Sequence, residues 1–181
     1  MKLEVQYKRA ETEEELHQIL ELQRNNILSK ISDNEKQREG FVTVHHTFEV
    51  LKAMNDKCPH ILAKKANKVI GYALCMLEEF KNDIEVLQPM FQQIDSCLKN
   101  NKSYIVMGQI CIDKAFRKQG IFKGLYNYMK RELQTNFDLI VTEVDEENTR
   151  SLNAHYAVGF KLLHTYKSNQ QDWALIYWNY S

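Results

Sequence analysis

The sequence predicts a mixed α/β fold in which a central, mostly antiparallel sheet of about seven strands carries helices on both faces. Three observations support this prediction. Several short segments alternate in polarity or are apolar on both faces, as half-buried and central strands are. Two of them form a hairpin that turns near Ala66-Asn67. An amphipathic run from Ile121 separates two others, and a strand–helix–strand order is typical of a parallel crossover. The expected strands are 3–8, 61–64, 68–77, 103–112, 137–144, 162–166 and 173–178.

Local signals place the helices between these strands. Thr12 followed by Glu15 forms a capping box, which predicts a helix that runs to about Asn25. Pro89 can start a helix, because a proline is tolerated in the first turn. Asn148 is a good N-terminal cap, and a glycine commonly ends a helix, as we expect at position 159. Further helices are expected at 48–57 and from 121.

Composition narrows the class of protein. The 181 residues include 44% hydrophobic and 27% charged residues, which is the composition of a globular domain, and we expect one domain over 1–181. A net charge of zero argues against nucleic acid as a partner. We find no run long enough to span a bilayer and no signal peptide, so we expect no membrane partner. Four scattered cysteines without a CxxC pair indicate reduced thiols in a cytoplasmic protein, and we expect no metal site.

The chain is organised around the strand at 103–112 and the turn that follows it. The turn is polar and leads through Gly120 into a helix N-terminus. Such an N-terminus presents unpaired backbone N–H groups and a partial positive charge, and a glycine lets the backbone approach an anion closely. Arg117, Lys118 and Lys123 add full charges. The pattern indicates an anion-binding turn, and the alternative is an ordinary strand-to-helix connection with a capping glycine.

Two motifs at a characteristic separation carry a family resemblance. The first is the turn Arg117-Lys118-Gln119-Gly120-Ile121-Phe122, and the second is the run from Asn148 to Gly159-Phe160 that follows the next strand. Together they resemble the GNAT superfamily of acyl-CoA-dependent N-acetyltransferases. The resemblance is strong from about Tyr104 to Phe160. It implies that two parallel neighbouring strands splay apart and that acetyl-CoA is the acetyl donor.

The resemblance also implies the residues of a cofactor site. Backbone amides from Lys118 to Lys123 would hold the pyrophosphate, and the strand edge at 110–112 would pair with the pantetheine arm. Phe122 stands where the family has Gly or Ala, so its side chain is expected to point away from the phosphates and to pack against the sheet or a neighbouring helix. The implied cofactor-binding residues are Ile110, Cys111, Ile112, Arg117, Lys118, Gln119, Gly120, Ile121, Phe122, Lys123 and Asn148.

Three residues are candidates for proton transfer. Many family members place a Tyr four residues before the closing glycine to protonate the leaving thiolate, and that position is His155 here. An imidazolium can do the same chemistry. The alternatives are Tyr156, which a helix turns to another face, or protonation by water with His155 in a packing role. Glu143, near the end of its strand, is the candidate base, and the alternative is a substrate-orienting charge or a surface ion pair.

The implied reaction is direct transfer of an acetyl group from acetyl-CoA to a primary amine. We expect a small-molecule acceptor rather than a protein, and a monomer or homodimer. The alternative function is a non-catalytic module that binds acyl-CoA for sensing or regulation. The long connection 78–100 is expected to be either a lid or acceptor-pocket wall, or a helix packed on the core far from the chemistry or at a dimer contact.

Overall fold

The computed structural model describes residues 4–26, 45–98 and 102–180. Within these residues a seven-stranded sheet has the order β1-β2-β3-β4-β5-β7-β6, and this confirms the predicted mixed α/β sheet. Among the described strands, β4 and β5 are parallel, and every other neighbouring pair is antiparallel. The strands are β1 Gln6–Arg9, β2 Ile61–Lys65, β3 Lys68–Met76, β4 Tyr104–Ile112, β5 Leu139–Asp145, β6 Lys161–Ser168 and β7 Gln171–Asn179.

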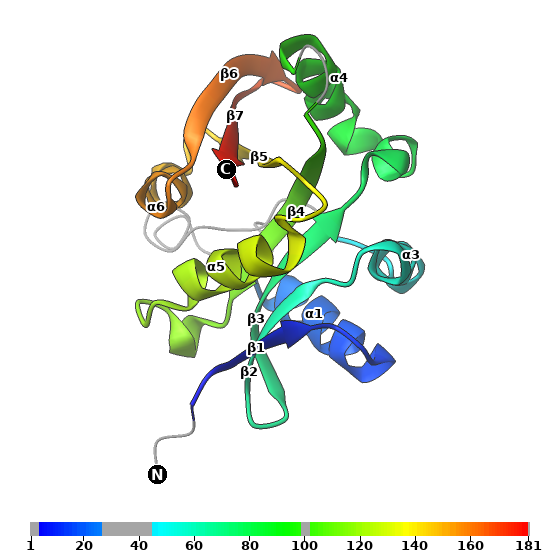
Figure 1. Ribbon diagram of the computed structural model, residues 1–181, viewed down its shortest axis with the longest axis vertical. Helices are drawn as coiled ribbons and strands as arrows, with labels where there is room; N and C mark the ends of the chain where they lie inside the picture. The colour runs from blue at the N-terminus through cyan, green and yellow to red at the C-terminus, as the bar shows by residue number, and fades with distance from the viewer. Residues whose placement is uncertain (1–3, 27–44, 99–101, 181) are drawn as a thin grey trace.

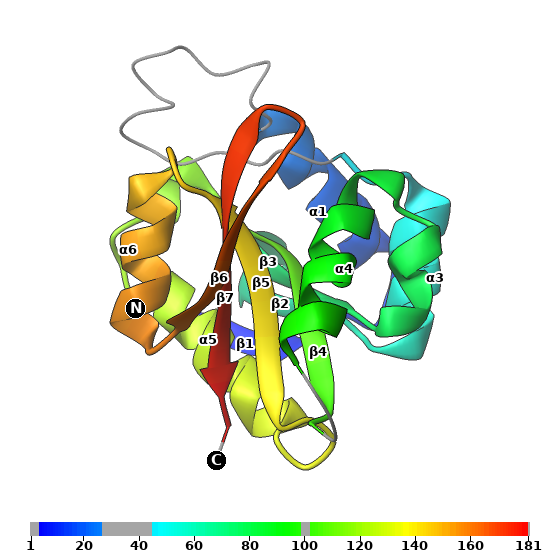
Figure 2. The ribbon, with the colours of Figure 1, turned by 90° about the horizontal axis from the view of Figure 1, so that it is seen from above.

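Helices cover both faces of this sheet, as predicted. Figures 1 and 2 show α5 and α6 on one face and α1, α3 and α4 on the other. No helix of the described ranges has the length and apolarity that a membrane span needs. The helices are α1 Glu13–Asn26, α3 Phe48–Lys57, α4 Gln88–Cys97, α5 Ile121–Leu133 and α6 Thr149–Val158, with short 3₁₀ turns at η2 Glu78–Asn82, η3 Glu85–Leu87 and η4 Lys114–Phe116.

Each face of the sheet has its own apolar core. One core joins α1, α3 and α4 to the sheet through side chains such as Leu51 and Ile94, and the other joins α5 through Leu125 and Met129. β3 is buried along its length except at Lys68, so the prediction that it is a central strand is confirmed. The strand has neighbours on both edges and a core on both faces.

The parallel pair β4–β5 is very short. Backbone pairing runs from Tyr104 opposite Leu139 to Val106 opposite Val141, although both strands continue beyond these residues. At the next position the Thr142 hydroxyl donates to the Met107 carbonyl at 2.8 Å. Past this point β4 pairs with β3 alone and β5 pairs with β7. The two strands therefore form a fork, the splayed pair that the family resemblance implies.

An irregularity in β4 lies directly at this fork. Ile110 pairs with Ala73, and Met107 pairs with Cys75. Between these two pairs the chain advances by three residues in β4 but by only two in β3. This extra residue is the signature of a β-bulge, which re-aims the side chains that follow it. Met107 and Ile110 consequently face the same core, whereas regular alternation would put them on opposite faces.

The element boundaries agree closely with the sequence-based expectations. The strand expected at 3–8 is found at Gln6–Arg9, and residues 1–3 lie outside the described residues. In the connection 78–100, α4 buries Met90, Phe91 and Ile94 in the core and contacts β6. This part of the connection is therefore a helix packed on the core, which is one of the two expected arrangements, and residues 99–101 lie outside the described residues.

A partly buried charge cluster fixes the start of α1. The carboxylate of Glu15, which is 3% exposed, accepts from Lys8 Nζ at 3.0 Å and Lys64 Nζ at 2.8 Å. It also accepts from the Thr12 N–H, and Thr12 Oγ1 accepts from the Glu15 N–H, so the predicted capping box is present. Burial raises the pKa of Glu15, but the hydrogen bonds from Lys64, from the Glu11 N–H and from Lys8 outweigh it and lower the pKa to about 2.

Replacing Glu15 with glutamine should therefore destabilise the fold. The Glu15→Gln amide keeps the capping-box acceptor, but it removes the counter-ion of Lys64 and leaves Lys8 paired with Glu11 alone, at a cost of about 2 kcal/mol at pH 7. Because the folded-state pKa is depressed, this stabilisation is present above about pH 4.5 and is lost as the pH falls toward about 2. Urea unfolding at pH 7 and pH 3 measures both effects.

The exposed Glu21 on the same helix provides the matched control. Glu21→Gln should change the free energy of unfolding by less than about 0.5 kcal/mol. An equal effect of the two substitutions, or a Glu15→Gln effect that persists undiminished at pH 3, would contradict this account of the cluster.

Candidate active site

A cavity of about 210 Å³ lies beside the turn that follows β4. Its walls come from the last residue of α1, the second half of β4, the turn, the first residues of α5 and the first two turns of α6. We call it the turn cavity. The residues that line it are Asn26, Ile110, Cys111, Ile112, Phe116, Arg117, Lys118, Gly120, Ile121, Phe122, Asn148, Arg150, Ser151 and Ala154.

The backbone of the turn has an unusual conformation that suits anion binding. Lys118 and Gly120 both have left-handed backbone angles, with φ of 61° and 80°. Gly120 is the N-cap of α5 and has no side chain to cap it, so the amides of the first helical turn lack intrahelical acceptors. A Cβ placed on Gly120 would stand in open space, with no atom within 4 Å. The glycine therefore keeps the approach to these amides clear.

The turn cavity is also electropositive. Arg117, Lys118 and Arg150 all line it. The Arg117 guanidinium donates to the Ile112 carbonyl at 3.2 Å and to Asn26 Oδ1 at 2.7 Å. These two contacts tie the turn to the end of β4 and to the last residue of α1. The positive charges and the helix N-terminus act in the same direction, so the cavity favours an anionic group.

The structure brings together most of the residues predicted for a cofactor site. Nine of them line the turn cavity, whereas Gln119 and Lys123 lie outside its lining. Gln119 instead donates to the Ala115 carbonyl. The Phe122 ring packs edge-on against Tyr126 and against His155 of α6, with centroids 5.2 and 5.0 Å apart, which agrees with the expectation that it contacts a neighbouring helix.

A second, smaller cavity of about 80 Å³ occupies the fork between β4 and β5. We call it the fork cavity. It shares Ile110, Asn148 and Ser151 with the turn cavity, so the two are adjacent along β4. Asn148 also caps α6, because its Oδ1 accepts from the Ser151 N–H. The fork cavity is lined by Met107, Gly108, Gln109, Ile110, Thr142, Glu143, Val144, Asp145, Asn148, Ser151, His155 and Trp173.

Glu143 lies in the fork cavity near the end of β5. Its carboxylate accepts a hydrogen bond from the hydroxyl of Tyr166 on β6. Burial raises the pKa of Glu143 to about 7, against a smaller lowering by the Tyr166 hydrogen bond. A carboxyl group with this pKa is divided between its two protonation states at neutral pH, as an efficient general base requires. The alternative of a surface ion pair receives no support, since its partner is a neutral hydroxyl.

His155 lies at the edge of the fork cavity but is 1% exposed. Nδ1 donates to the Ser151 carbonyl at 2.7 Å, and Nε2 accepts from the Tyr126 hydroxyl at 2.7 Å. Burial lowers the pKa of His155 to about 4, partly offset by the hydrogen bond to Ser151. The imidazole is therefore neutral at pH 7, and both of its nitrogens are engaged. This geometry favours the packing role of His155 over the acid role.

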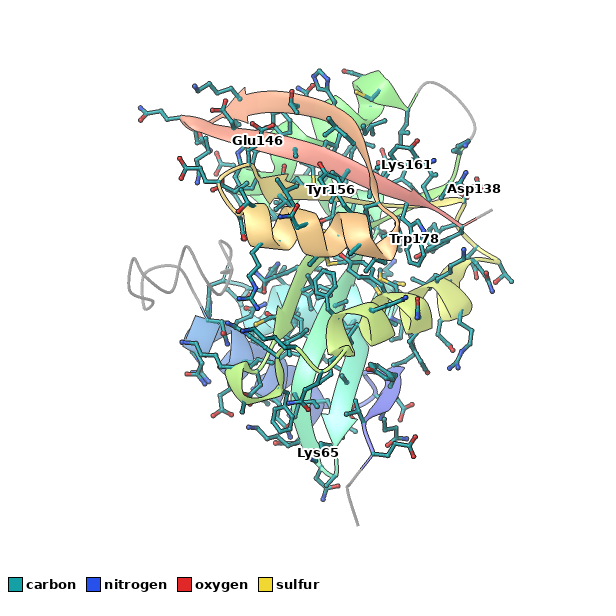
Figure 3. The ribbon with its side chains drawn as sticks, turned by 90° about the vertical axis from the view of Figure 1, so that its left-hand side faces the viewer. Lys65, Asp138, Glu146, Tyr156, Lys161 and Trp178 are labelled. Atoms are coloured by element: carbon teal, nitrogen blue, oxygen red, sulfur yellow. The ribbon has the colours of Figure 1, made fainter. Side chains whose placement is uncertain are left out.

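Tyr156 lies on a different side of α6. Its side chain is 42% exposed and lines neither the turn cavity nor the fork cavity. Figure 3 shows it on α6, with Trp178 beyond the C-terminal end of that helix. The structure thus separates Tyr156 from the other candidate residues, as the helical rotation of about 100° per residue predicts.

Three residues of the site were not singled out from the sequence. Tyr166 contacts Glu143 from a strand 23 positions later, and its local sequence contains no signal for this contact. Gln109 lies in the fork cavity and accepts from the Tyr72 hydroxyl at 2.6 Å. Arg150 could have been found, because a basic residue just after a helix cap is a sign of anion binding. Within the described ranges, no cluster of three or more His, Cys, Asp or Glu side chains could hold a metal.

Comparison with solved structures gives the same fold repeatedly. The ribosomal-protein-S18-alanine N-acetyltransferase of Escherichia coli aligns with a TM-score of 0.65 and 12% identity, over 98% of this chain and 95% of that one. A chain of the NatC complex bound to Gag peptide and CoA aligns with a TM-score of 0.66 and 18% identity, over 97% and 98%. YncA of Salmonella typhimurium, solved with its cofactor acetyl-CoA, aligns with a TM-score of 0.63 and 11% identity, over 98% and 94%.

Comparison of the sequence with family models and with curated proteins gives two further results. No curated protein matches the chain significantly. The model of the acetyltransferase (GNAT) family matches residues 15–160. This match spans most of the chain, including the fork, the glycine turn and the Asn148-capped helix, and the chain therefore belongs to the GNAT acetyltransferase family.

Proposed function

We propose that this protein transfers an acetyl group from acetyl-CoA to a primary amine. The observation that carries the proposal is the adjacency of two cavities along β4: an electropositive one at the glycine turn and a polar one at the fork that contains Glu143. The first suits a phosphate-bearing cofactor, and the second suits the reacting groups. Acetyl-CoA, when bound, supplies a thioester activated for attack by the amine.

The residues of the turn cavity fit this cofactor. The amides after Gly120 and the charges of Arg117, Lys118 and Arg150 would hold the pyrophosphate. Among the described residues, the backbone of Ile110 to Ile112 has no strand partner on the β5 side, so it can pair with the amide groups of the pantetheine arm as an added strand would. An amide of β4 beyond the fork would stabilise negative charge that develops on the acetyl oxygen.

Glu143 is proposed as the general base. An amine is mostly protonated at neutral pH, and it must lose a proton before it can attack. The carboxylate of Glu143 would accept this proton, directly or through one water. Tyr166 would keep the carboxylate oriented through its hydrogen bond. The other titratable groups that line the fork cavity with Glu143 are Asp145 on the same strand and His155 on α6.

Protonation of the leaving thiolate is assigned to water rather than to a side chain. His155 is neutral and engaged at both nitrogens, and Tyr156 lies outside both cavities. We propose that His155 acts as a positioning residue. Its contacts with Tyr126 and Phe122 hold α5 against α6. The N-terminal residues of both helices line the turn cavity.

Loss of the base should abolish most of the activity. The assay measures free thiol released from acetyl-CoA in the presence of a panel of amines and peptides. With any acceptor that supports turnover, Glu143→Gln should lower kcat about 100-fold or more, because glutamine cannot accept a proton. Glu146→Gln, at an exposed position three residues later, is the matched control and should leave kcat unchanged. CoA binding without acceptor-dependent thiol release across the panel would contradict the proposal and favour the sensor function.

The Tyr166 hydroxyl should set the pH dependence of this activity. The active form of Glu143 is the carboxylate, so the rate falls as the pH drops through about 7. Tyr166→Phe removes a hydrogen bond that lowers this pKa, so the acid limb should move to higher pH, with activity recovered in alkaline buffer. Tyr177→Phe, a change on the neighbouring strand β7, should not move the limb. An acid limb that stays in place in Tyr166→Phe would show that Tyr166 does not act on Glu143.

The protonation state of His155 can be measured independently of catalysis. In an NMR titration, its imidazole resonance should stay constant between pH 8 and pH 5 and change with a midpoint of about 4. The resonance is assigned by its absence in His155→Gln. A midpoint near the ordinary value of about 6.5 would restore His155 as a candidate acid.

A further inference from the structure

Cys58, just before β2, and Cys75, which pairs with Met107 of β4, lie next to each other. Ile61, the first residue of β2, pairs with Ala73 of β3. Cys75 lies two residues beyond Ala73 on β3, so it lies opposite the segment that precedes β2 and contains Cys58. The Cys75 N–H donates to His60 Nδ1 at 3.1 Å, which fixes its position opposite this segment. The Cys75 thiol is in hydrogen-bond contact with the Cys58 sulfur. Both cysteines are free thiols and belong to the same buried cluster.

Arg9 places a positive charge against this pair. Its Nη2 lies 3.5 Å from Cys58 Sγ. The hydrogen bond from Cys75 and the nearby guanidinium lower the pKa of the Cys58 thiol against the opposing effect of burial, and the same hydrogen bond raises the pKa of Cys75. The pair is therefore asymmetric. Cys58 is the sulfur that ionises, and Cys75 is a neutral thiol beside it, which is the arrangement of an attacking and a resolving cysteine.

Two buried polar groups beside the sulfurs have no hydrogen-bond partner among the described residues. They are Arg9 Nε and the hydroxyl of Tyr180. Tyr180 is 7% exposed, and burial is the main cause that raises its pKa. Unpaired buried donors are uncommon and carry a free-energy cost. Both groups could donate to an oxygen atom bound at Cys58.

We propose that Cys58 and Cys75 form an oxidisable dithiol site whose substrate is a small hydroperoxide. The Cys58 thiolate attacks the terminal oxygen of the peroxide, the O–O bond breaks, and the other oxygen leaves as an alkoxide that takes up a proton. The product at Cys58 is a sulfenic acid. The Cys75 sulfur then attacks the Cys58 sulfur, the S–S bond forms, and water leaves. Two electrons pass from the two thiols to the peroxide, which supplies the oxidant.

Mass spectrometry of the reduced full-length chain after treatment with hydrogen peroxide tests this proposal. The chain should lose two hydrogens, and proteolysis should yield one disulfide-linked peptide pair containing Cys58 and Cys75. Cys75→Ser should stop the reaction at the first step, so that a cyclic dione traps a sulfenic acid at Cys58. Cys58→Ser should give neither product. Oxidation without a Cys58–Cys75 link, or first trapping at the more exposed Cys97, would overturn the proposal.

The role of Arg9 is tested by the rate of the first step. Arg9→Gln should slow trapping at Cys58 about fivefold at pH 7, because a rise of one unit from a pKa of about 7 lowers the thiolate fraction from about one half to about one tenth. Arg9→Lys, which keeps the charge, should retain most of the rate. Arg24→Gln, at an exposed position on α1, is the matched control and should react like the unchanged chain. A rate in Arg9→Gln equal to that control would show that Arg9 does not activate Cys58.

Discussion

The short pairing between β4 and β5 is the constraint on which the site depends. Three residue pairs hold the strands together, and the Thr142 hydroxyl then takes the place of the next backbone contact. Beyond Thr142 the two backbones separate, and the edge of β4 that faces β5 has no strand partner in the part of the chain that the structure describes. The bulge before Ile110 turns the following side chains of β4 toward the turn cavity. The loss of pairing between β4 and β5 thus opens the fork cavity, and it also exposes the backbone edge of β4 that leads to this cavity.

The two cavities differ in charge and in how strongly they bury their ionisable groups. The turn cavity has basic side chains and a helix N-terminus, which suit a group that stays ionised. The fork cavity is smaller, and there burial raises the pKa of Glu143 to about 7. Glu15 shows the opposite outcome, because two lysines reach its carboxylate and lower its pKa to about 2. The difference lies in the partner: a neutral hydroxyl leaves a carboxyl able to exchange protons, whereas ammonium groups keep it ionised.

The sequence predicted most of the architecture, because its signals are local. The capping box at Thr12, the hairpin near Ala66 and the caps of α6 depend on residues a few positions apart, and the structure contains all of them. The site was predicted in part. Glu143 and the glycine turn were found from motifs, but the Tyr166 hydroxyl comes from a distant strand. His155 was singled out by its spacing from Gly159, and this spacing carries no information about burial. His155 is buried because Phe122 and Tyr126 of α5 pack against it.

A crystal structure of the chain with acetyl-CoA tests the central claim most directly, namely that the fork and the glycine turn form one continuous cofactor and reaction site. The account predicts a pyrophosphate against the backbone amides that follow Lys118, a pantetheine arm paired with Ile110 to Ile112, and a thioester in the fork close to Glu143. A cofactor bound elsewhere on the chain, or bound in the turn cavity with its thioester directed away from the fork, would contradict it.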